Sequence, residues 1–326
     1  MTEHPFAKYV RILGKGKSGS RSLELDEARN AMGMILSGEV EDVQLGAFLM
    51  LLRVKEESPE ELAGFVLAVR DHLDAPSLNV DLDWASYAGK RRQQAWYLLA
   101  ALALADSGLK VVMHGAAGHT AERVYSEALL RELGEPIAQQ WSDCQSALAQ
   151  RNFCYLPLPL ISPALQRMID LRQQFGLRSP VHSLTRLINP FAADYSMQSI
   201  FHPAYADSHQ RAAALLGQAH AAVFKGEAGE AERKPEALCK VKYVHDGELS
   251  EQQWPKLLDG RQPWQSELSS DALRRAWRHD ELDDYGRHAI VGSIAIALQL
   301  RDASLDCDTA MTSARELWAD RRRDRL

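Results

Sequence analysis

The chain has 326 residues, of which 46% are hydrophobic and 25% are charged, and its formal net charge is −6 at pH 7. Such a chain can bury a large core, and its length predicts two domains or one domain with a small lobe. The negative net charge excludes a protein that is basic over its whole surface, so a polyanion could bind only at a local basic patch.

The cysteines and the apolar runs indicate the class of protein. Four cysteines, Cys144, Cys154, Cys239 and Cys307, show no Cys-x-x-Cys spacing, and no signal peptide is recognised. We therefore expect reduced thiols, no metal site and a cytoplasmic protein. The longest apolar run, residues 95–105, is too short to span a bilayer. It predicts a buried helix and no membrane partner.

The first 75 residues are predicted to form a small helical domain. Apolar residues recur at helical spacing over 25–35 and over 43–54, and residues 6–13 also have a helical pattern. A further helix is expected after Ser58, which forms a capping-box pattern with Glu61 and is followed by proline at the first helical position.

Residues 76–326 are predicted to form an α/β domain with a mainly parallel central sheet. Strands are expected at 80–84, 109–113, 153–156, 197–201, 221–224 and 238–244, with helices at 95–105 and 207–217. A strand–helix–strand crossover of this kind builds a parallel sheet. Residues 224–237 are expected to be an exposed loop, and the last 20 residues an amphipathic helix.

A basic cluster lies near the amino terminus. Between residues 8 and 21 the chain has five basic residues, including Lys15, Lys17 and Arg21, and no acidic residue. Residues 14–19 match Gly-x-Gly-x-x-Gly, but a dinucleotide site needs a strand before the first glycine, and here a helix is predicted. The cluster is either a solvated turn or a contact for phosphate groups.

Two segments carry a family resemblance. Residues 22–65 resemble the N-terminal helical domain of anthranilate phosphoribosyltransferases, and residues 162–190 resemble a segment of their α/β domain that ends in Asn189-Pro190. The resemblance implies the fold of nucleoside phosphorylases and class II phosphoribosyltransferases, with about 160–190 packing back on the helical domain. It also implies a homodimer formed through that domain.

The family's phosphate loop, Gly-Thr-Gly-Gly-Asp, is altered in this chain. Tyr87 occupies the threonine position, Lys90 lies near the second glycine and Arg91 lies where the aspartate would be, so only Gly89 is retained. An arginine in place of a carboxylate would no longer recruit magnesium but would still favour phosphate. Together with Arg92, these residues predict a loop that binds polyanions. The alternative is that the three cations merely flank the start of a helix.

Other family positions are partly retained. His114 and Gly115 remain from the Lys-His-Gly-Asn-Arg signature, whereas the two residues that follow are alanines. The paired Asp-Glu of the metal-binding stretch would fall at residues 231–232, where only Glu232 remains, although Glu230 could substitute by position. His114, Gly115, Asn189 and Glu232 are therefore interpreted as a vestigial site, and the stretch as an acidic surface loop.

A second basic group lies within the resembling segment. By the resemblance, Arg172 aligns with the arginine that holds the anthranilate carboxylate; its alternative role is an arginine that reaches the edge of its helix. Arg167, Arg178 and Arg186 lie nearby, and His182 replaces an asparagine of the family. This group is expected to add positive potential.

The resemblance leaves two functions open. A branch of paralogues that lacks the phosphate and anthranilate motifs is associated with nucleic-acid binding, and this chain resembles that branch. It is then expected to bind DNA or RNA through its basic patches, without sequence preference and without a cofactor, and Tyr87 and Trp96 are candidates for base stacking. The alternative is a phosphoribosyltransferase or other glycosyltransferase with altered substrate specificity, which would need Mg²⁺.

Overall fold

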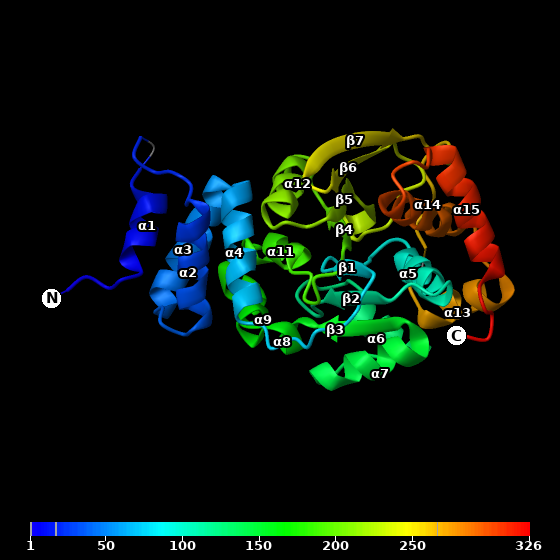
Figure 1. The fold of residues 1–326 in the computed structure, drawn as a ribbon, viewed down its shortest axis with the longest axis horizontal. Helices are drawn as coiled ribbons and strands as arrows, with labels where there is room; N and C mark the ends of the chain where they lie inside the picture. Colours follow the sequence, from blue (N-terminus) through cyan, green and yellow to red (C-terminus); the bar gives the residue numbers. More distant parts are fainter. Residues whose placement is uncertain (1, 17, 266) are drawn as a thin grey trace.

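The amino-terminal helices form a separate bundle. The computed structural model describes residues 2–16, 18–265 and 267–326. Figure 1 shows the bundle at one end of the molecule, in blue. It consists of α1 (Ala7–Gly14), α2 (Leu25–Leu36), α3 (Asp42–Lys55) and α4 (Pro59–Asp71). The capping box of Ser58 and Glu61 is present at the start of α4. The predicted helical domain is therefore confirmed.

Close packing holds α2 against α4. A Cβ atom placed on Gly64 would lie 2.3 Å from the carbonyl oxygen of Leu25 and 2.7 Å from the Cβ of Ala28. Only glycine allows the two helices to approach this closely. Elsewhere in the bundle, Phe48 packs edge-to-face with Phe6 and with Phe65, at centroid distances of 5.2 and 6.0 Å.

The second part is built on a seven-stranded sheet with the order β3-β2-β1-β4-β5-β6-β7. The five strands β1 to β5 run parallel to one another, whereas β6 is antiparallel to β5 and β7 is antiparallel to β6. The mainly parallel sheet is thus confirmed. The strands are β1 (Leu82–Ser86), β2 (Val111–Gly115), β3 (Phe153–Pro157), β4 (Tyr195–Ile200), β5 (His220–Lys225), β6 (Cys239–His245) and β7 (Glu248–Trp254).

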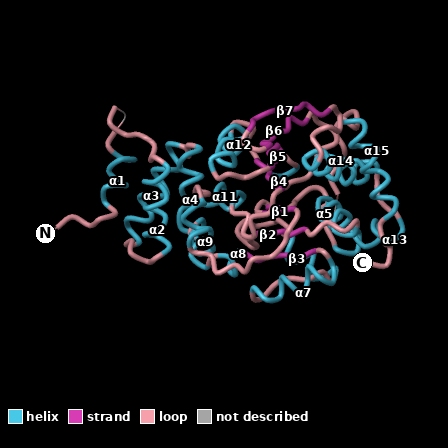
Figure 2. Tube along the Cα trace, in the orientation of Figure 1, coloured by secondary structure: helices cyan, strands magenta, loops and turns pink. Residues whose placement is uncertain are grey.

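Helices cover both faces of the sheet, as Figures 1 and 2 show. One face carries α5 (Trp96–Asp106), α6 (Ser126–Leu133), α13 (Ser270–His279), α14 (Asp284–Arg301) and α15 (Cys307–Asp320). On the other face lie the bundle together with α7 (Trp141–Arg151), α8 (Leu158–Ile161), α9 (Pro163–Asp170), α10 (Arg172–Phe175), α11 (Val181–Leu184) and α12 (Tyr205–Leu215). Short 3₁₀ turns occupy Thr185–Leu187 and Glu227–Gly229.

The bundle is joined to the sheet domain through α4. The guanidinium of Arg70 donates to the carbonyl oxygens of Ile188 and Leu187, at 2.8 and 3.2 Å. One hydrophobic core contains residues of both parts, for example Phe65 of α4 and Val181 of α11. The segment that contains α8 to α11 therefore lies between the bundle and the sheet.

One expectation about the second half is wrong, and one strand of it was not expected. Residues 224–237 are not an exposed loop, because Glu230, Glu232 and Arg233 in that segment are fully buried. The strand β7 was not expected, since its side chains are mostly exposed up to the buried Trp254 and show no apolar alternation. The predicted C-terminal helix is present as α15, and Arg321 and Arg325, which follow it, are buried.

Within the described residues, no helix has the length and apolar character needed to cross a membrane.

The contact at Gly64 predicts a stability effect. Replacing Gly64 with alanine should lower the free energy of unfolding by about 1–3 kcal/mol, because the new methyl group overlaps the backbone of α2. A matched control is Gly33→Ala on α2, where a Cβ would meet nothing within 4 Å and alanine should add up to about 1 kcal/mol of helix propensity. Urea denaturation of both variants tests this, and equal midpoints would contradict it.

Candidate polyanion site

The loop after β1 is closed by a carboxylate of the chain itself. Glu230 Oε1 accepts hydrogen bonds from the backbone N–H groups of Ala88 and Gly89, at 2.7 and 2.5 Å. Glu230 is fully buried, and burial raises the pKa of its carboxyl group while the two amides lower it. The guanidinium of Arg123 donates to the carbonyl oxygens of the same two loop residues. The amides that could hold a phosphate therefore already donate to a carboxyl oxygen of the chain itself.

Next to this loop lies a buried ion pair. Lys90 Nζ is 2.5 Å from Glu232 Oε1, and the two side chains are 1% and 0% exposed. The other oxygen of Glu232 accepts from the backbone N–H of Tyr97, at 2.9 Å, in the first turn of α5. Burial raises the pKa of the Glu232 carboxyl, and the ammonium of Lys90 opposes that effect. Lys90 thus neutralises a carboxylate that caps a helix N-terminus.

The retained histidine belongs to a buried polar network. Tyr87 Oη lies 2.7 Å from His114 Nδ1, and His114 Nε2 lies 3.2 Å from Asp83 Oδ1. All three side chains are buried, and burial raises the pKa of Tyr87 well above its usual value. A Cβ on Gly115 would lie 2.0 Å from the carbonyl oxygen of Ser86, so the adjacent strand excludes any larger residue. These residues support the sheet and have no access to a ligand.

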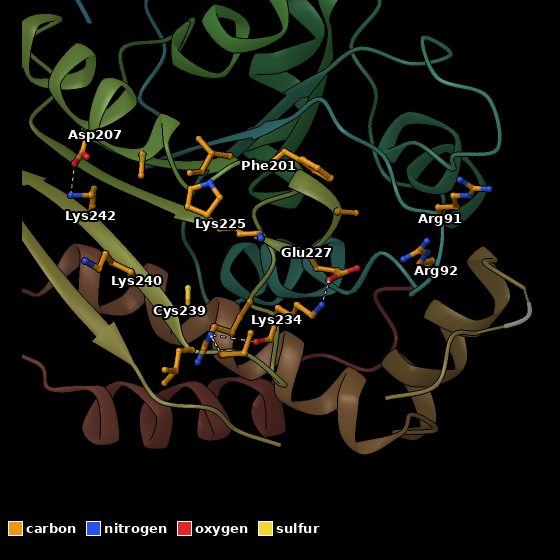
Figure 3. Close-up of a pocket in the computed structure, with 18 of the residues that line it drawn as sticks. Arg91, Arg92, Phe201, Asp207, Lys225, Glu227, Lys234, Cys239, Lys240 and Lys242 are labelled. Atoms are coloured by element: carbon orange, nitrogen blue, oxygen red, sulfur yellow. Dashed lines mark hydrogen bonds and ion pairs between the residues drawn. The ribbon is translucent and has the colours of Figure 1, made fainter. Parts of the chain in front are cut away.

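A basic groove lies at the carboxyl ends of β4 and β5 (Figure 3). Its volume is about 790 Å³. Its lining includes eight basic side chains and two carboxylates, an excess of six positive charges in a chain whose net charge is −6. The basic residues are Arg91, Arg92, Arg123, Lys225, Arg233, Lys234, Lys240 and Lys242. Ligands of open α/β sheets bind at this edge.

Part of the positive charge in the groove is unpaired. Lys242 pairs with Asp207 at 2.5 Å, and Lys234 with Glu236 at 3.1 Å. Arg92 instead lies over the ring of Trp264, at 3.9 Å from its centroid. Lys240 pairs with Glu251 at 3.0 Å, and Arg91 with Glu122 at 2.5 Å. Among the residues that the structure describes, no carboxylate forms an ion pair with Arg92, Arg123 or Lys225.

A separate group of arginines surrounds the loop at residues 119–120. The guanidinium of Arg172 donates to the carbonyl oxygen of His119 and to Thr120 Oγ1, and Arg178 donates to the same hydroxyl at 3.3 Å. Arg186 is buried and donates to the carbonyl oxygen of His182. Burial and the charges of Arg123, Arg186 and Arg172 lower the pKa of Arg178 to about 10. These arginines therefore form a concentrated positive region.

The remaining predicted residues lie elsewhere. Arg21 pairs with Glu27 at 2.6 Å, and Arg167 pairs with Asp42 at 2.5 Å. Lys15 is exposed after α1, and none of these three residues lines the groove. Lys17 is outside the described residues. The described residues of the basic cluster at 8–21 are therefore not part of the groove in a single chain.

Comparison with known proteins identifies the family. Two family models match the chain: the helical bundle domain of a glycosyl transferase family over residues 8–73, and the α/β domain of that family over residues 94–259. The chain belongs to this glycosyl transferase family. The anthranilate phosphoribosyltransferase of Oleidesulfovibrio alaskensis is 32% identical over 69% of this chain and 69% of its own length. The uncharacterized protein YbiB of Escherichia coli is 28% identical over 73% of this chain and 76% of its own length.

Solved structures of the family have the same fold. The anthranilate phosphoribosyltransferase of Thermus thermophilus matches 97% of this chain and 95% of its own, with a TM-score of 0.78 and 22% identity. The yeast enzyme in complex with PRPP and Mg matches 98% of this chain and 94% of its own, also with a TM-score of 0.78 and with 18% identity. At these identities the comparison shows the shared fold alone.

The residues present do not fit the magnesium site that the glycosyl transferase family implies. Mg²⁺ needs free oxygen ligands, but Glu230 is bonded to the loop amides and Glu232 to Lys90. Over residues 2–16, 18–265 and 267–326, no cluster of three or more His, Cys, Asp or Glu side chains is placed to hold a metal ion.

Several predicted site residues do not line the basic groove. Tyr87, Lys90 and Arg186 are buried, and the stacking candidate Trp96 is only 2% exposed. Asn189 is structural: its side chain bonds the backbone of Ala193 on both the donor and the acceptor side. Gly89 lies in the loop after β1 with φ near +70°, a backbone conformation that favours glycine.

Arg91 and Arg92 do line the groove. The sequence analysis missed the other basic residues of the groove, Arg123, Lys225, Arg233, Lys234, Lys240 and Lys242. The positions of Lys240 and Lys242, two residues apart, could have indicated one face of a strand.

The buried ion pair predicts a large and pH-dependent effect. Lys90→Met leaves Glu232 as an unpaired buried charge, so the free energy of unfolding should fall by about 3–5 kcal/mol. The loss should shrink in acid, because protonation removes the unpaired charge of Glu232. Burial raises the pKa of this carboxyl group in the folded protein, so its contribution to stability is most favourable below the unfolded pKa and is lost as the pH rises through the folded pKa. Guanidinium denaturation at several pH values measures both effects.

Two controls separate charge from packing. Combining Lys90→Met with Glu232→Gln removes both charges and keeps an acceptor for Tyr97, so most of the lost stability should return. Arg91→Met removes an exposed charge, whose ion pair with Glu122 is 56% and 69% exposed, and should change stability by less than about 1 kcal/mol. A double variant as unstable as Lys90→Met would contradict the assignment.

Proposed function

We propose that this member of the glycosyl transferase family binds nucleic acid without sequence preference, through the basic groove at the carboxyl ends of β4 and β5. The observation that carries the proposal is the excess of six positive charges in the groove of a chain with a net charge of −6. A positive groove on a protein whose net charge is negative attracts a polyanion to the groove and repels it from the rest of the surface.

The arrangement of charge supports an extended ligand. The basic residues come from the loops after β1 and β2, from the end of β5 and from β6, and Figure 3 shows Arg91 and Arg92 at one side and Lys240 and Lys242 at the other. A single phosphate could reach only one of these groups, whereas a phosphodiester backbone offers charges at regular intervals.

Two exposed aromatic side chains favour single-stranded segments. Phe201 lines the groove and is 45% exposed, and Trp264, which packs on Arg92, is 55% exposed. Aromatic side chains beside a basic groove stack on unpaired bases irrespective of sequence. These residues replace Tyr87 and Trp96 as the stacking candidates.

The closed loop after β1 argues against a transferase that uses PRPP and Mg²⁺. Diphosphate binding would require the amides of Ala88 and Gly89, and both donate to Glu230. A metal would require carboxylates that are not already engaged, whereas Glu232 is paired with Lys90. The proposed ligand therefore binds outside this loop.

A homodimer through the helical bundle is part of the proposal. Val43 and Val54 on α3 are 80% and 86% exposed. Eleven residues correspond to about three helical turns, so the two valines share one face of the helix. A second copy of the chain packed on this face would cover them and would double the number of grooves.

The electrostatic proposal predicts a salt-dependent affinity. Binding of a single-stranded oligonucleotide should weaken steeply between about 50 and 200 mM salt, because bound cations are released from the phosphates. Replacing Arg91, Arg92 and Lys225 together with glutamine should lower the slope of log K against log salt by about 2, at roughly 0.7 per contact. Fluorescence anisotropy at several salt concentrations measures this slope.

The control changes basic residues outside the groove. A variant with Arg21→Gln and Arg167→Gln removes exposed charges that pair with Glu27 and Asp42, and its slope should match the unaltered protein. Affinity that does not depend on salt would contradict the proposal. So would saturable 1:1 binding of PRPP with Mg²⁺ in calorimetry, because it requires an open loop after β1.

The dimer proposal predicts a change in mass in solution. Light scattering after gel filtration should give twice the monomer mass. Replacing Val43 and Val54 with lysine should shift the protein toward monomer, because like charges would meet across the two-fold axis. A lysine pair at the exposed Leu177 and Leu249 serves as the control. A monomer at all concentrations would rule out the dimer.

A further inference from the structure

A smaller cavity lies beside the groove, between the helical bundle and the sheet domain. Its volume is about 110 Å³, and it shares Ile200 and Phe201 with the groove. Its polar lining comes from the end of α3 and the residues after it, from residues 178–179 before α11, from α11 and the turn that follows, and from α12. It includes Arg53, Glu57, Arg178, His182, Arg186 and His209.

The cavity wall contains buried polar atoms that lack a partner. His182 and His209 are 6% and 2% exposed. Among the described residues, neither His182 Nε2 nor His209 Nδ1 has a hydrogen-bond partner. Burial lowers the pKa of both rings, that of His209 to about 3. A buried polar atom without a partner is unfavourable unless a ligand or water supplies one.

Two arginines of the cavity also lack an acidic partner. Arg186 is 8% exposed, and its guanidinium, which has five N–H donors, bonds the carbonyl oxygen of His182. Within the described part of the chain, no carboxylate forms an ion pair with Arg178 or Arg186; the charge of Glu230 acts on Arg186 without such a contact. Glu57, which also lines the cavity, is only partly ionised at neutral pH, because burial raises its pKa to about 7.

The size of the cavity limits what can enter. A water molecule needs roughly 10–15 Å³ of such space, so about 110 Å³ accommodates a group as large as a phosphate. Pockets for whole nucleotides or drug-sized ligands usually measure about 300–1,000 Å³. An internal phosphodiester is also excluded, because a sugar would have to fit on each side of it.

We propose that this cavity binds the terminal phosphate monoester of a nucleic-acid strand whose remaining phosphates lie in the groove. A phosphate monoester carries a charge of about −1.5 to −2 and three acceptor oxygens. It would give acceptors to Arg178 and Arg186 and would favour protonation of the two histidines. The proposal rests on the proposed function, because the groove supplies the rest of the strand.

The test compares strand ends. Internally labelled single-stranded oligonucleotides of one sequence would carry a 5′-phosphate, a 3′-phosphate or only hydroxyl ends, and their affinities would be measured by fluorescence anisotropy. We expect one phosphorylated form to bind about tenfold more tightly than the hydroxyl form, the effect of one good charge-assisted contact. Millimolar inorganic phosphate should remove this preference by occupying the cavity, while binding of the hydroxyl form persists.

Matched variants separate the cavity from the groove. Arg186→Gln should abolish the end preference, and Arg178→Gln, at a less buried position, provides the same test if the first variant does not fold. The variant with Arg91, Arg92 and Lys225 changed to glutamine should bind every oligonucleotide more weakly and keep the end preference. Equal, salt-dependent binding of all three forms would overturn the cavity proposal alone, and no binding of any form would overturn both proposals.

Discussion

The hydrogen bonds from the amides of Ala88 and Gly89 to the Glu230 carboxylate determine what the rest of the site can do. Two converging N–H groups form a site for an anion. Because the carboxyl group of Glu230 occupies this site from within the chain, an external phosphate would have to displace it. The bond draws residues 226–232 into the interior, where Glu232 in turn requires the ammonium of Lys90. The loop, Glu230 and the ion pair of Lys90 and Glu232 therefore form one buried, hydrogen-bonded unit.

Because this unit is closed, the positive charge available to a ligand lies outside it. Arg91 and Arg92 directly follow Lys90, yet their side chains line the groove instead of the buried loop. Lys225, Lys234, Lys240 and Lys242 complete the groove from the other side of the sheet edge. The groove thus lies at the carboxyl ends of the strands, where open α/β sheets bind their ligands, and cations predominate in its lining.

The local patterns of the sequence predicted most of the fold. The capping box at Ser58 and the apolar run at residues 95–105 correspond to α4 and α5, since helix signals depend on neighbours three and four residues away. The strand β7 escaped detection because it is an edge strand with exposed side chains on both faces. Residues 224–237 were misassigned because an acidic, glycine-containing composition is typical of a surface loop.

For the candidate site, the sequence by itself determined that three consecutive cations, Lys90, Arg91 and Arg92, follow Gly89. Only the tertiary structure decided which cations are available to a ligand. Lys90 differs from its neighbours because Glu232, far away in the chain, lies 2.5 Å from it in the folded protein. Burial and pairing depend on such distant contacts, which no pattern of adjacent residues contains.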